Sequence, residues 1–377
     1  MSNPVDLPEP PAPRPGLLFE PFSLAGLRLR NRIVRSATYE KRADEDGFVT
    51  EELVALYEAL AAGGSGLIIT GNALVHPSGR AMPNMLSIHN DFYVPGLAEL
   101  ASAVHRKGGL IAIQLNHGGR QCPALLLGGE RPLAPSEVPD PSSGVTPRAM
   151  ADAEIWDMVD AFADAADRAR RAGFDAVQLH AAHGFLMSSF LSPHTNRRDD
   201  YWGGDEERRF HFAEEVLKAV RGAVGDFPVL IKMNCDDLLP GGIEPAESAR
   251  AARRLEASGL DAVEISGGMR ESRVRAARPD VRGPEDEAYF RDSGRLFKES
   301  LRIPVILTGG MRTRAVMEKM LAGGYADLVG MSRPLIRQPD LPNRMKAEAE
   351  KADCVSCNGC LDFGRPGPVG CARLRDG

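Results

Sequence analysis

Residues 175–204, DAVQLHAAHGFLMSSFLSPHTNRRDDYWGG, form the stretch that decides the fold of this 377-residue chain. The stretch begins with a short apolar run at 176–180, which changes at once to a polar turn that contains glycine. Such a run is typical of a parallel strand that is buried on both faces. Side chains alternate along a strand, so Gln178 and His180 share one side, and His183 follows on the turn. One histidine would more often be an ordinary core or surface residue, but two at one strand end predict the mouth of an active site.

The same pattern of a short apolar run, a polar turn and an amphipathic helix repeats along the whole chain. Glycines mark the ends of several helices, as at Gly63, Gly108 and Gly173, and a strand follows each of them. The predicted strands are 32–36, 67–70, 110–115, 176–180, 229–233, 262–266, 305–308 and 328–330, and the predicted helices are 51–62, 94–107, 155–172, 206–224, 245–257, 288–301, 314–322 and 340–349. Alternating strands and helices of this number predict an α/β fold, a (β/α)8 TIM barrel rather than an open doubly wound sheet.

The chain divides into three parts. Residues 1–17 are rich in proline and are expected to form a flexible arm, 18–350 form the barrel, and 351–377 form a cysteine-rich extension. A hairpin around Ala25 and Gly26 is expected to close the bottom of the barrel. Two long connections, 120–154 and 267–287, are expected to act as lids, because the long loops that follow barrel strands lie on the catalytic face.

Composition and charge exclude several classes of partner. The net charge of −6 argues against binding to nucleic acid or to an anionic membrane surface. No apolar run is long enough to span a bilayer, and the proline-rich N-terminus lacks the apolar core of a secretory signal. We therefore expect a cytoplasmic protein with reduced thiols.

The strand ends of a barrel share one face, so the polar residues that follow the strands are candidate site residues. The first five strands supply Ser36, Ala37, Thr38, Tyr39, Gly71, Asn72, Gln114, Asn116, His117, His180, His183 and Lys232. The loops after the last two strands contain Gly309, Gly310, Ser332 and Arg333, and Thr313 can cap the next helix. Loops after the seventh and eighth strands commonly bind phosphate, and helix amides favour an anion. These residues alone predict a phosphorylated ligand.

The segment HAAHGFLMSSFLSPHTNRRDDYWGG closely resembles the Old Yellow Enzyme family of FMN-dependent oxidoreductases, and the resemblance extends over about residues 18–337. It implies that His180 and His183 hold an electron-withdrawing oxygen of the substrate over the flavin. It also makes the phosphorylated ligand FMN. The implied FMN-binding residues are Ser36, Ala37, Thr38, Gly71, Gln114, Lys232, Gly309, Gly310, Ser332 and Arg333, with Gln114 at the pyrimidine edge and Lys232 near the N1 and O2 atoms.

The sequence departs from the family at one position. Phe185 stands where the family usually has a tyrosine that donates a proton to the substrate. Tyr39 is a candidate replacement donor, and packing against the flavin edge is an equally good explanation for it. The chain has no G-x-G-x-x-G motif between a strand and a helix, so NAD(P)H is expected to use the same flavin face as the substrate, in ping-pong turnover.

Four cysteines, Cys354, Cys357, Cys360 and Cys371, lie close together near the C-terminus. In a reduced compartment this density indicates a metal rather than disulfides. The C-x2-C-x2-C spacing with a fourth cysteine suits a [4Fe–4S] cluster, with zinc as the main alternative and an empty remnant as the second. The motif also resembles that of trimethylamine dehydrogenase and 2,4-dienoyl-CoA reductase, which are relatives of the Old Yellow Enzymes.

Three functions follow from these observations. The first is FMN-dependent reduction of an α,β-unsaturated carbonyl compound with NAD(P)H. The second is oxidative demethylation or dehydrogenation of an amine, although only Trp156 and Trp202 were candidates for an ammonium cage. The third is a phosphate-binding barrel without catalysis. The expected partners are a small-molecule substrate, a second copy of the chain and, if a cluster is present, a separate electron-transfer protein.

Overall fold

The computed structural model describes residues 16–375, apart from 142, 273 and 275. The predicted arm at 1–17 therefore lies almost entirely outside the described residues. No helix in the described part of the chain is long and apolar enough to cross a membrane.

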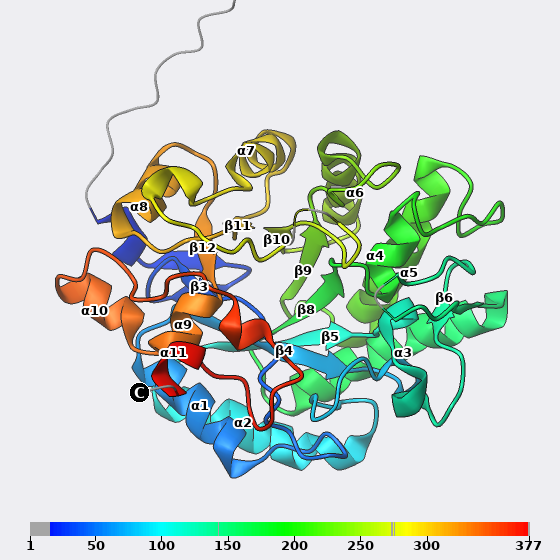
Figure 1. Ribbon diagram of the computed structural model, residues 1–377, viewed down its shortest axis with the longest axis horizontal. Coiled ribbons are helices and arrows are strands. Elements are labelled where there is room, and N and C mark those ends of the chain that lie inside the picture. The colour runs from blue at the N-terminus through cyan, green and yellow to red at the C-terminus, as the bar shows by residue number, and fades with distance from the viewer. Residues whose placement is uncertain (1–15, 142, 273, 275, 376–377) are drawn as a thin grey trace, which may run out of the picture.

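Parallel strands form a closed barrel in the order β10-β11-β12-β3-β4-β5-β8-β9 (Figure 1). They are β3 (Ile33–Arg35), β4 (Leu67–Leu74), β5 (Ile111–Asn116), β8 (Ala176–Ala181), β9 (Val229–Asn234), β10 (Ala262–Ser266), β11 (Val305–Leu307) and β12 (Leu328–Met331). The last strand pairs with the first, with Gly330 opposite Val34, and this pairing closes the barrel. All eight predicted strands and the predicted TIM barrel are confirmed.

The predicted helices surround the barrel (Figure 1). They are α1 (Glu51–Ala62), α2 (Val94–Arg106), α3 (Asp152–Arg171), α5 (Glu206–Val224), α6 (Pro245–Ala257), α7 (Arg291–Ser300), α8 (Arg314–Ala322) and α10 (Leu341–Ala347). Helix α3 begins three residues before the predicted start, because the Glu154 carboxylate accepts the Ala151 N–H at 2.8 Å and stabilises the first turn. Helix α7 begins later than predicted, because Ala288 has a positive φ of 51°.

The predicted hairpin closes the barrel at the N-terminal ends of the strands. Strands β1 (Phe22–Leu24) and β2 (Leu27–Leu29) pair antiparallel. Leu24 and Leu29 are fully buried and pack with the first residues of several barrel strands, including Leu67, Ala176 and Leu328. The opposite end of the barrel is therefore the end that can open to a ligand.

Several short elements carry too few residues for a periodic pattern and were not predicted. They are helices α4 (Leu186–Leu191), α9 (Arg333–Arg337) and α11 (Ala372–Arg375), the strand pair β6 (Leu133–Ala134) and β7 (Arg148–Ala149), and 3-10 helices at Leu17–Phe19, Pro77–Gly79, Asp91–Tyr93, Gly119–Gln121, Ala124–Leu127, Pro284–Asp286 and Gly359–Leu361. Helix α4 matters most for the site, because it begins three residues after His183, with Phe185 as its N-cap, and all of its residues are buried.

The two long loops and the C-terminal extension meet at the open end of the barrel. The loops are joined by an ion pair between the buried Arg120 and Glu271. The extension is attached through Asn358, whose side chain donates to the Ala277 carbonyl at 2.8 Å and accepts from Arg333 of α9 at 2.6 Å. Figure 1 shows this extension in red beside α9.

Candidate active site

Two adjoining cavities lie at the carboxyl ends of the barrel strands. The larger has a volume of about 860 Å³, within the size range of small-molecule sites, and the smaller has about 140 Å³. Lys232, His183 and Ser332 line both. The predicted residues that line one or both cavities are Ser36, Ala37, Thr38, Tyr39, Asn72, Gln114, His180, His183, Lys232, Gly309, Gly310, Ser332 and Arg333. The structure therefore brings together nearly the whole predicted site.

Gly71 is the one implied FMN-binding residue that lines neither cavity, and the strand-end candidates Asn116 and His117 also lie outside both. The Gly71 N–H donates to the Glu40 carboxylate at 3.1 Å and to the Tyr57 hydroxyl at 3.0 Å. A side chain at this position would begin 2.1 Å from Glu40 Oε2 and 2.7 Å from the Thr38 carbonyl. Gly71 thus allows close packing behind the cavity wall, and this role places it one layer away from any ligand.

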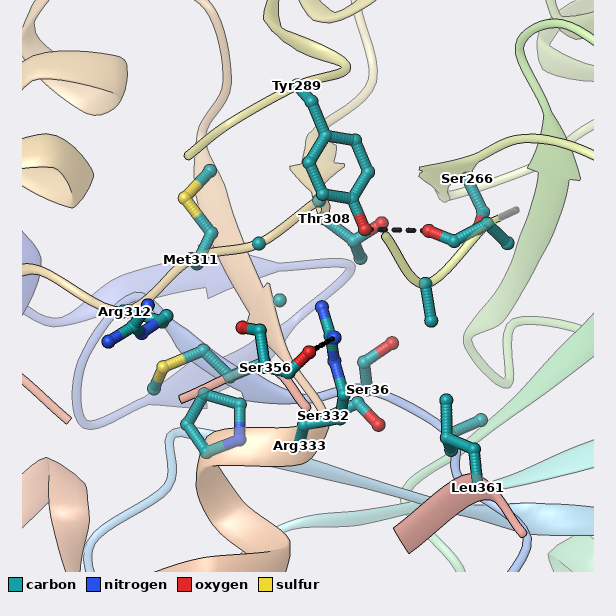
Figure 2. A pocket seen from close by; sticks show the side chains of 18 of the residues that line it. Ser36, Ser266, Tyr289, Thr308, Met311, Arg312, Ser332, Arg333, Ser356 and Leu361 are labelled. Atoms are coloured by element: carbon teal, nitrogen blue, oxygen red, sulfur yellow. Dashed lines mark hydrogen bonds between the residues drawn. The ribbon is translucent and has the colours of Figure 1, made fainter. Parts of the chain in front are cut away.

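Backbone amides at residues 309–311 lie in the wall of the smaller cavity. Gly309 and Gly310 have φ values of +116° and +77°, and within the described residues the N–H groups of 309–311 donate to no protein acceptor. Consecutive free amides of this kind suit a phosphate. Figure 2 shows Arg333, Ser332 and Ser36 near one another on one side of this cavity, with Tyr289 and Thr308 on the other.

The prediction that Thr313 caps helix α8 and that the amides of this helix favour an anion is wrong in one respect. The Glu287 carboxylate accepts the N–H groups of Arg312 and Thr313, each at 2.8 Å, and the Thr313 hydroxyl at 2.6 Å. Thr313 therefore makes no side-chain cap, and an acidic residue already occupies the amides that were expected to favour an anion. A phosphate in this cavity would depend on the 309–311 amides and on Arg333.

The Arg333 guanidinium is buried and faces both the cavity and the C-terminal extension. One of its nitrogens donates to the Arg278 carbonyl at 2.8 Å and to Asn358 Oδ1 at 2.6 Å. Its positive charge is not paired with a carboxylate in any described ion pair. The side chain is thus both a positive charge for an anion and an anchor for the extension.

The histidine pair is held in one arrangement by its neighbours. His180 Nδ1 accepts the Ala182 N–H at 3.3 Å, so the proton of the neutral ring lies on Nε2, where it can be donated to a ligand. His183 has a positive φ of 64°, which is unusual for a residue other than glycine. Asn234 accepts its N–H at 3.0 Å and Gln121 donates to its carbonyl at 2.6 Å.

Burial keeps both imidazoles neutral. Loss of hydration lowers the pKa of His180 well below its usual value, and the neighbouring His183 and Lys232 add to this effect. Burial and then Lys232 lower the pKa of His183 to about 3. The His183 ring also shares a hydrogen bond of 2.7 Å with the Ser266 hydroxyl. Two neutral imidazoles can donate hydrogen bonds to an uncharged carbonyl oxygen.

The two aromatic residues discussed as proton donors have different surroundings. The Phe185 ring lines the large cavity and packs edge-to-face against His180, with ring centroids 4.8 Å apart. The Tyr39 hydroxyl donates to the Pro83 carbonyl, and burial followed by the nearby Glu40 raises the pKa of Tyr39. The Tyr39 ring packs edge-to-face on Phe363, at a centroid distance of 5.3 Å. The Tyr39 proton is therefore engaged with the backbone.

Some residues of the site were missed from the sequence. Ser266 and Tyr289 line the smaller cavity, and Leu361 and Phe363 bring the C-terminal extension to the large one. Glu264 lies beneath the cavity floor and is fully buried. The sequence could have indicated a role for Glu264, because a charged residue in the apolar strand run AVEIS needs a buried partner.

The four cysteines line a small cleft next to Arg333. Arg337 and Arg373 line the same cleft, and an Arg337 nitrogen lies 3.5 Å from Cys371 Sγ. Within the described residues, however, no three cysteine, histidine or acidic side chains lie close enough together to hold one metal ion. The donor set suits a cluster or zinc, whereas the present spacing of the thiols does not.

The fold and cavities define an α/β barrel with cavities of ligand size at the carboxyl ends of the strands. The chain belongs to the NADH:flavin oxidoreductase / NADH oxidase family, whose model matches residues 17–352. It is 38% identical to an NADH oxidase of Thermoanaerobacter brockii, over 91% of this chain and 53% of that protein. It is also 38% identical to an NADPH dehydrogenase of Geobacillus thermodenitrificans, over 86% of this chain and 92% of that protein.

A solved structure of an Old Yellow Enzyme homologue from Zymomonas mobilis has a TM-score of 0.76 to this chain and 28% sequence identity, and the likeness covers 90% of this chain and 95% of that one. The family match and these relatives confirm the resemblance to the Old Yellow Enzymes. The chain spans about half the length of the Thermoanaerobacter relative.

Proposed function

We propose that this protein reduces a carbon–carbon double bond that is conjugated to a carbonyl group, with NAD(P)H as the reductant. The observation that carries the proposal is the neutral histidine pair in a cavity of about 860 Å³, where His180 Nε2–H can be donated to a carbonyl oxygen. The FMN would lie across the two cavities, and when bound it supplies two-electron transfer between nicotinamide and substrate. The alternative of a barrel without catalysis is set aside, because the family is one of oxidoreductases.

The residues of the chain have separate parts in this proposal. The 309–311 amides and Arg333 bind the phosphate of FMN, Gln114 contacts the pyrimidine edge of the ring, and Lys232 stabilises negative charge near N1 and O2. His180 and His183 orient and polarise the substrate oxygen. The loops joined by Arg120 and Glu271 restrict the access of water.

We expect both Gln114→Ala and Arg333→Ala to weaken FMN binding by about 10- to 100-fold, because a hydrogen bond to a charged group contributes about 1.5–3 kcal/mol and an unmet buried partner costs a similar amount. Flavin fluorescence during titration of the apoprotein measures this directly. Arg254→Ala is the matched control, because Arg254 pairs with Glu214 and lines neither cavity.

Since Arg333 also anchors the extension, the Gln114 variant decides the outcome if Arg333→Ala disturbs the fold. Folded wild-type protein that neither contains nor takes up FMN would contradict the proposed site.

We also propose that the cysteine cleft receives a [4Fe–4S] cluster, with zinc as the alternative. Four thiols and the arginines Arg337 and Arg373 around one cleft support this assignment, because a cluster with four thiolates carries net negative charge. Formation of the cluster requires the thiols to move closer together than they are here. Electrons from such a cluster would pass to a separate protein.

Metal analysis of anaerobically purified protein tests this proposal. We expect about four iron and four sulfide per chain, and loss of both in a Cys357→Ser/Cys360→Ser variant, because a cube requires its thiolate ligands. One zinc per chain, bound by the same cysteines, would support the alternative. Absence of both metals in protein reconstituted with iron and sulfide would leave the extension as a structural cover of the cavity.

A further inference from the structure

We infer that Glu264 is a positioning residue, which fixes the orientation of the Gln114 amide and offsets the charge of Lys232 where they face the FMN ring. This inference deepens the proposed function and rests on it. Glu264 lies on β10 with no exposed surface, and it contacts no cavity. Its two carboxylate oxygens nevertheless connect to both residues that we assign to the ring, directly to Lys232 and through Gln178 to Gln114.

One carboxylate oxygen holds a lysine and a serine. Lys232 Nζ lies 3.0 Å from Glu264 Oε1, and the Ser36 hydroxyl donates to the same oxygen. Lys232 also donates to Ser36 Oγ at 2.9 Å. An ammonium group has three N–H donors, so two are used inside the protein and one is left for a ligand. Glu264 thereby determines which way the lysine points.

The other carboxylate oxygen determines the orientation of two amides in turn. Gln178 Nε2 donates to Glu264 Oε2 at 2.7 Å, because an ionised carboxylate can only accept. Gln178 must then present its carbonyl oxygen to Gln114, whose Nε2 donates to it at 2.7 Å. This sequence of bonds leaves Gln114 Oε1 as an acceptor for the ligand. The pyrimidine ring of a flavin offers an N–H donor at its edge, which matches this orientation.

The charge of Glu264 has an effect of its own. Side-chain exposure is 6% for Lys232 and zero for Glu264, so water screens the pair only weakly. A lone lysine would favour the reduced flavin, in which negative charge gathers near N1 and O2. The adjacent carboxylate cancels most of that field at the ring. The pair therefore holds a lysine in place without strongly favouring the reduced state.

Four proteins test this account: wild type, Glu264→Gln, Lys232→Met and the double variant. The summed charge of residues 232 and 264 beneath the ring is zero, +1, −1 and zero in these four proteins, in that order. We expect the ratio of affinities for reduced over oxidised FMN to rise about tenfold in Glu264→Gln, to fall about tenfold in Lys232→Met, and to return near the wild-type value in the double variant. A tenfold change corresponds to about 30 mV in the midpoint potential of a two-electron couple.

Redox titration of the bound flavin gives this ratio without an activity measurement. Glu214→Gln is the matched control, because Glu214 is also a buried acid paired with a cation, Arg254, but lies on α5 outside both cavities. The midpoint potential of the flavin in Glu214→Gln should equal that in wild type. If Glu264→Gln does not fold, the comparison of Lys232→Met with the double variant still measures removal of the carboxylate.

The orientation of Gln114 has a separate test. Gln178→Met breaks the connection to Gln114 without changing any charge, so it should weaken oxidised and reduced FMN by a similar factor and leave the potential unchanged. Shifts of the same sign in Glu264→Gln and Lys232→Met, or none in either with FMN bound, would overturn the inference. Failure of wild-type protein to bind FMN would instead overturn the proposed function.

Discussion

Phe185→Tyr is expected to raise the rate of reduction of simple enones by about 10²–10⁴-fold, which is the usual contribution of a positioned general acid. The Phe185 ring already lines the large cavity and packs against His180, so the variant adds a hydroxyl where the proposal places the substrate oxygen and α-carbon. Burial lowers the pKa of both histidines, and the proposal assigns them to hydrogen bonds with the substrate oxygen, so neither is a ready proton donor. Single-turnover oxidation of the reduced enzyme by cyclohexenone measures the effect.

Tyr39→Phe is the matched comparison, because it removes the hydroxyl of the tyrosine that lines the large cavity in the native protein. The Tyr39 hydroxyl donates to the Pro83 carbonyl and the pKa of Tyr39 is raised, so we expect Tyr39→Phe to change the rate of enone reduction by less than about tenfold. A large loss in Tyr39→Phe together with no gain in Phe185→Tyr would identify Tyr39 as the donor.

Amine oxidation remains the competing reaction in this test. Trp156 and Trp202, which the sequence suggested for an ammonium cage, pack against each other at a centroid distance of 4.9 Å and line neither cavity. The aromatic residues that do line the large cavity are Tyr39, Phe185 and Phe363. Activity with amines and an artificial electron acceptor, with no enone reduction in any variant, would favour dehydrogenation.

The barrel could be predicted from the sequence because its signals are local. Each strand is a short apolar run, and a turn and an amphipathic helix follow it, so the bounds of α1, α5, α6 and α8 agree with the prediction to the residue. Most site residues could be predicted for the same reason, since residues after barrel strands must share one face. Gly71 shows the limit of this reasoning, because the space beside it is filled by Glu40 and Thr38, which are far away in the sequence.

Contacts between distant segments could not be predicted. Nothing near Thr313 in the sequence indicates that Glu287 takes the helix amides, and nothing near Phe363 places it on Tyr39. The unusual backbone of His183 likewise depends on Asn234 and Gln121. These contacts form only when the loops and the extension pack over the barrel.

His180→Ala with His183→Ala is expected to slow enone reduction by about 10³-fold or more while FMN stays bound. Loss of a single donor to a developing oxyanion costs about 10²–10³ in rate, and the two histidines share one oxygen. FMN retention is expected because the ring and phosphate contacts assigned to Gln114, Lys232 and the 309–311 amides are unchanged. Stopped-flow measurement of both half-reactions separates the effects: oxidation by enone should slow, whereas reduction by NAD(P)H should change less.

Asparagine provides the sharper control for this prediction. His180→Asn with His183→Asn keeps an N–H donor at each position, so it should recover much of the lost rate if hydrogen bonding is the function of the pair. Because the pKa of both histidines is lowered by burial, they stay neutral between pH 5 and 8, and the deficit of the alanine variant should be independent of pH in that range. A deficit that appears only on one side of pH 6.5 would mean that an imidazolium acts in the reaction, and a native enone rate in the alanine variant would remove the pair from the mechanism.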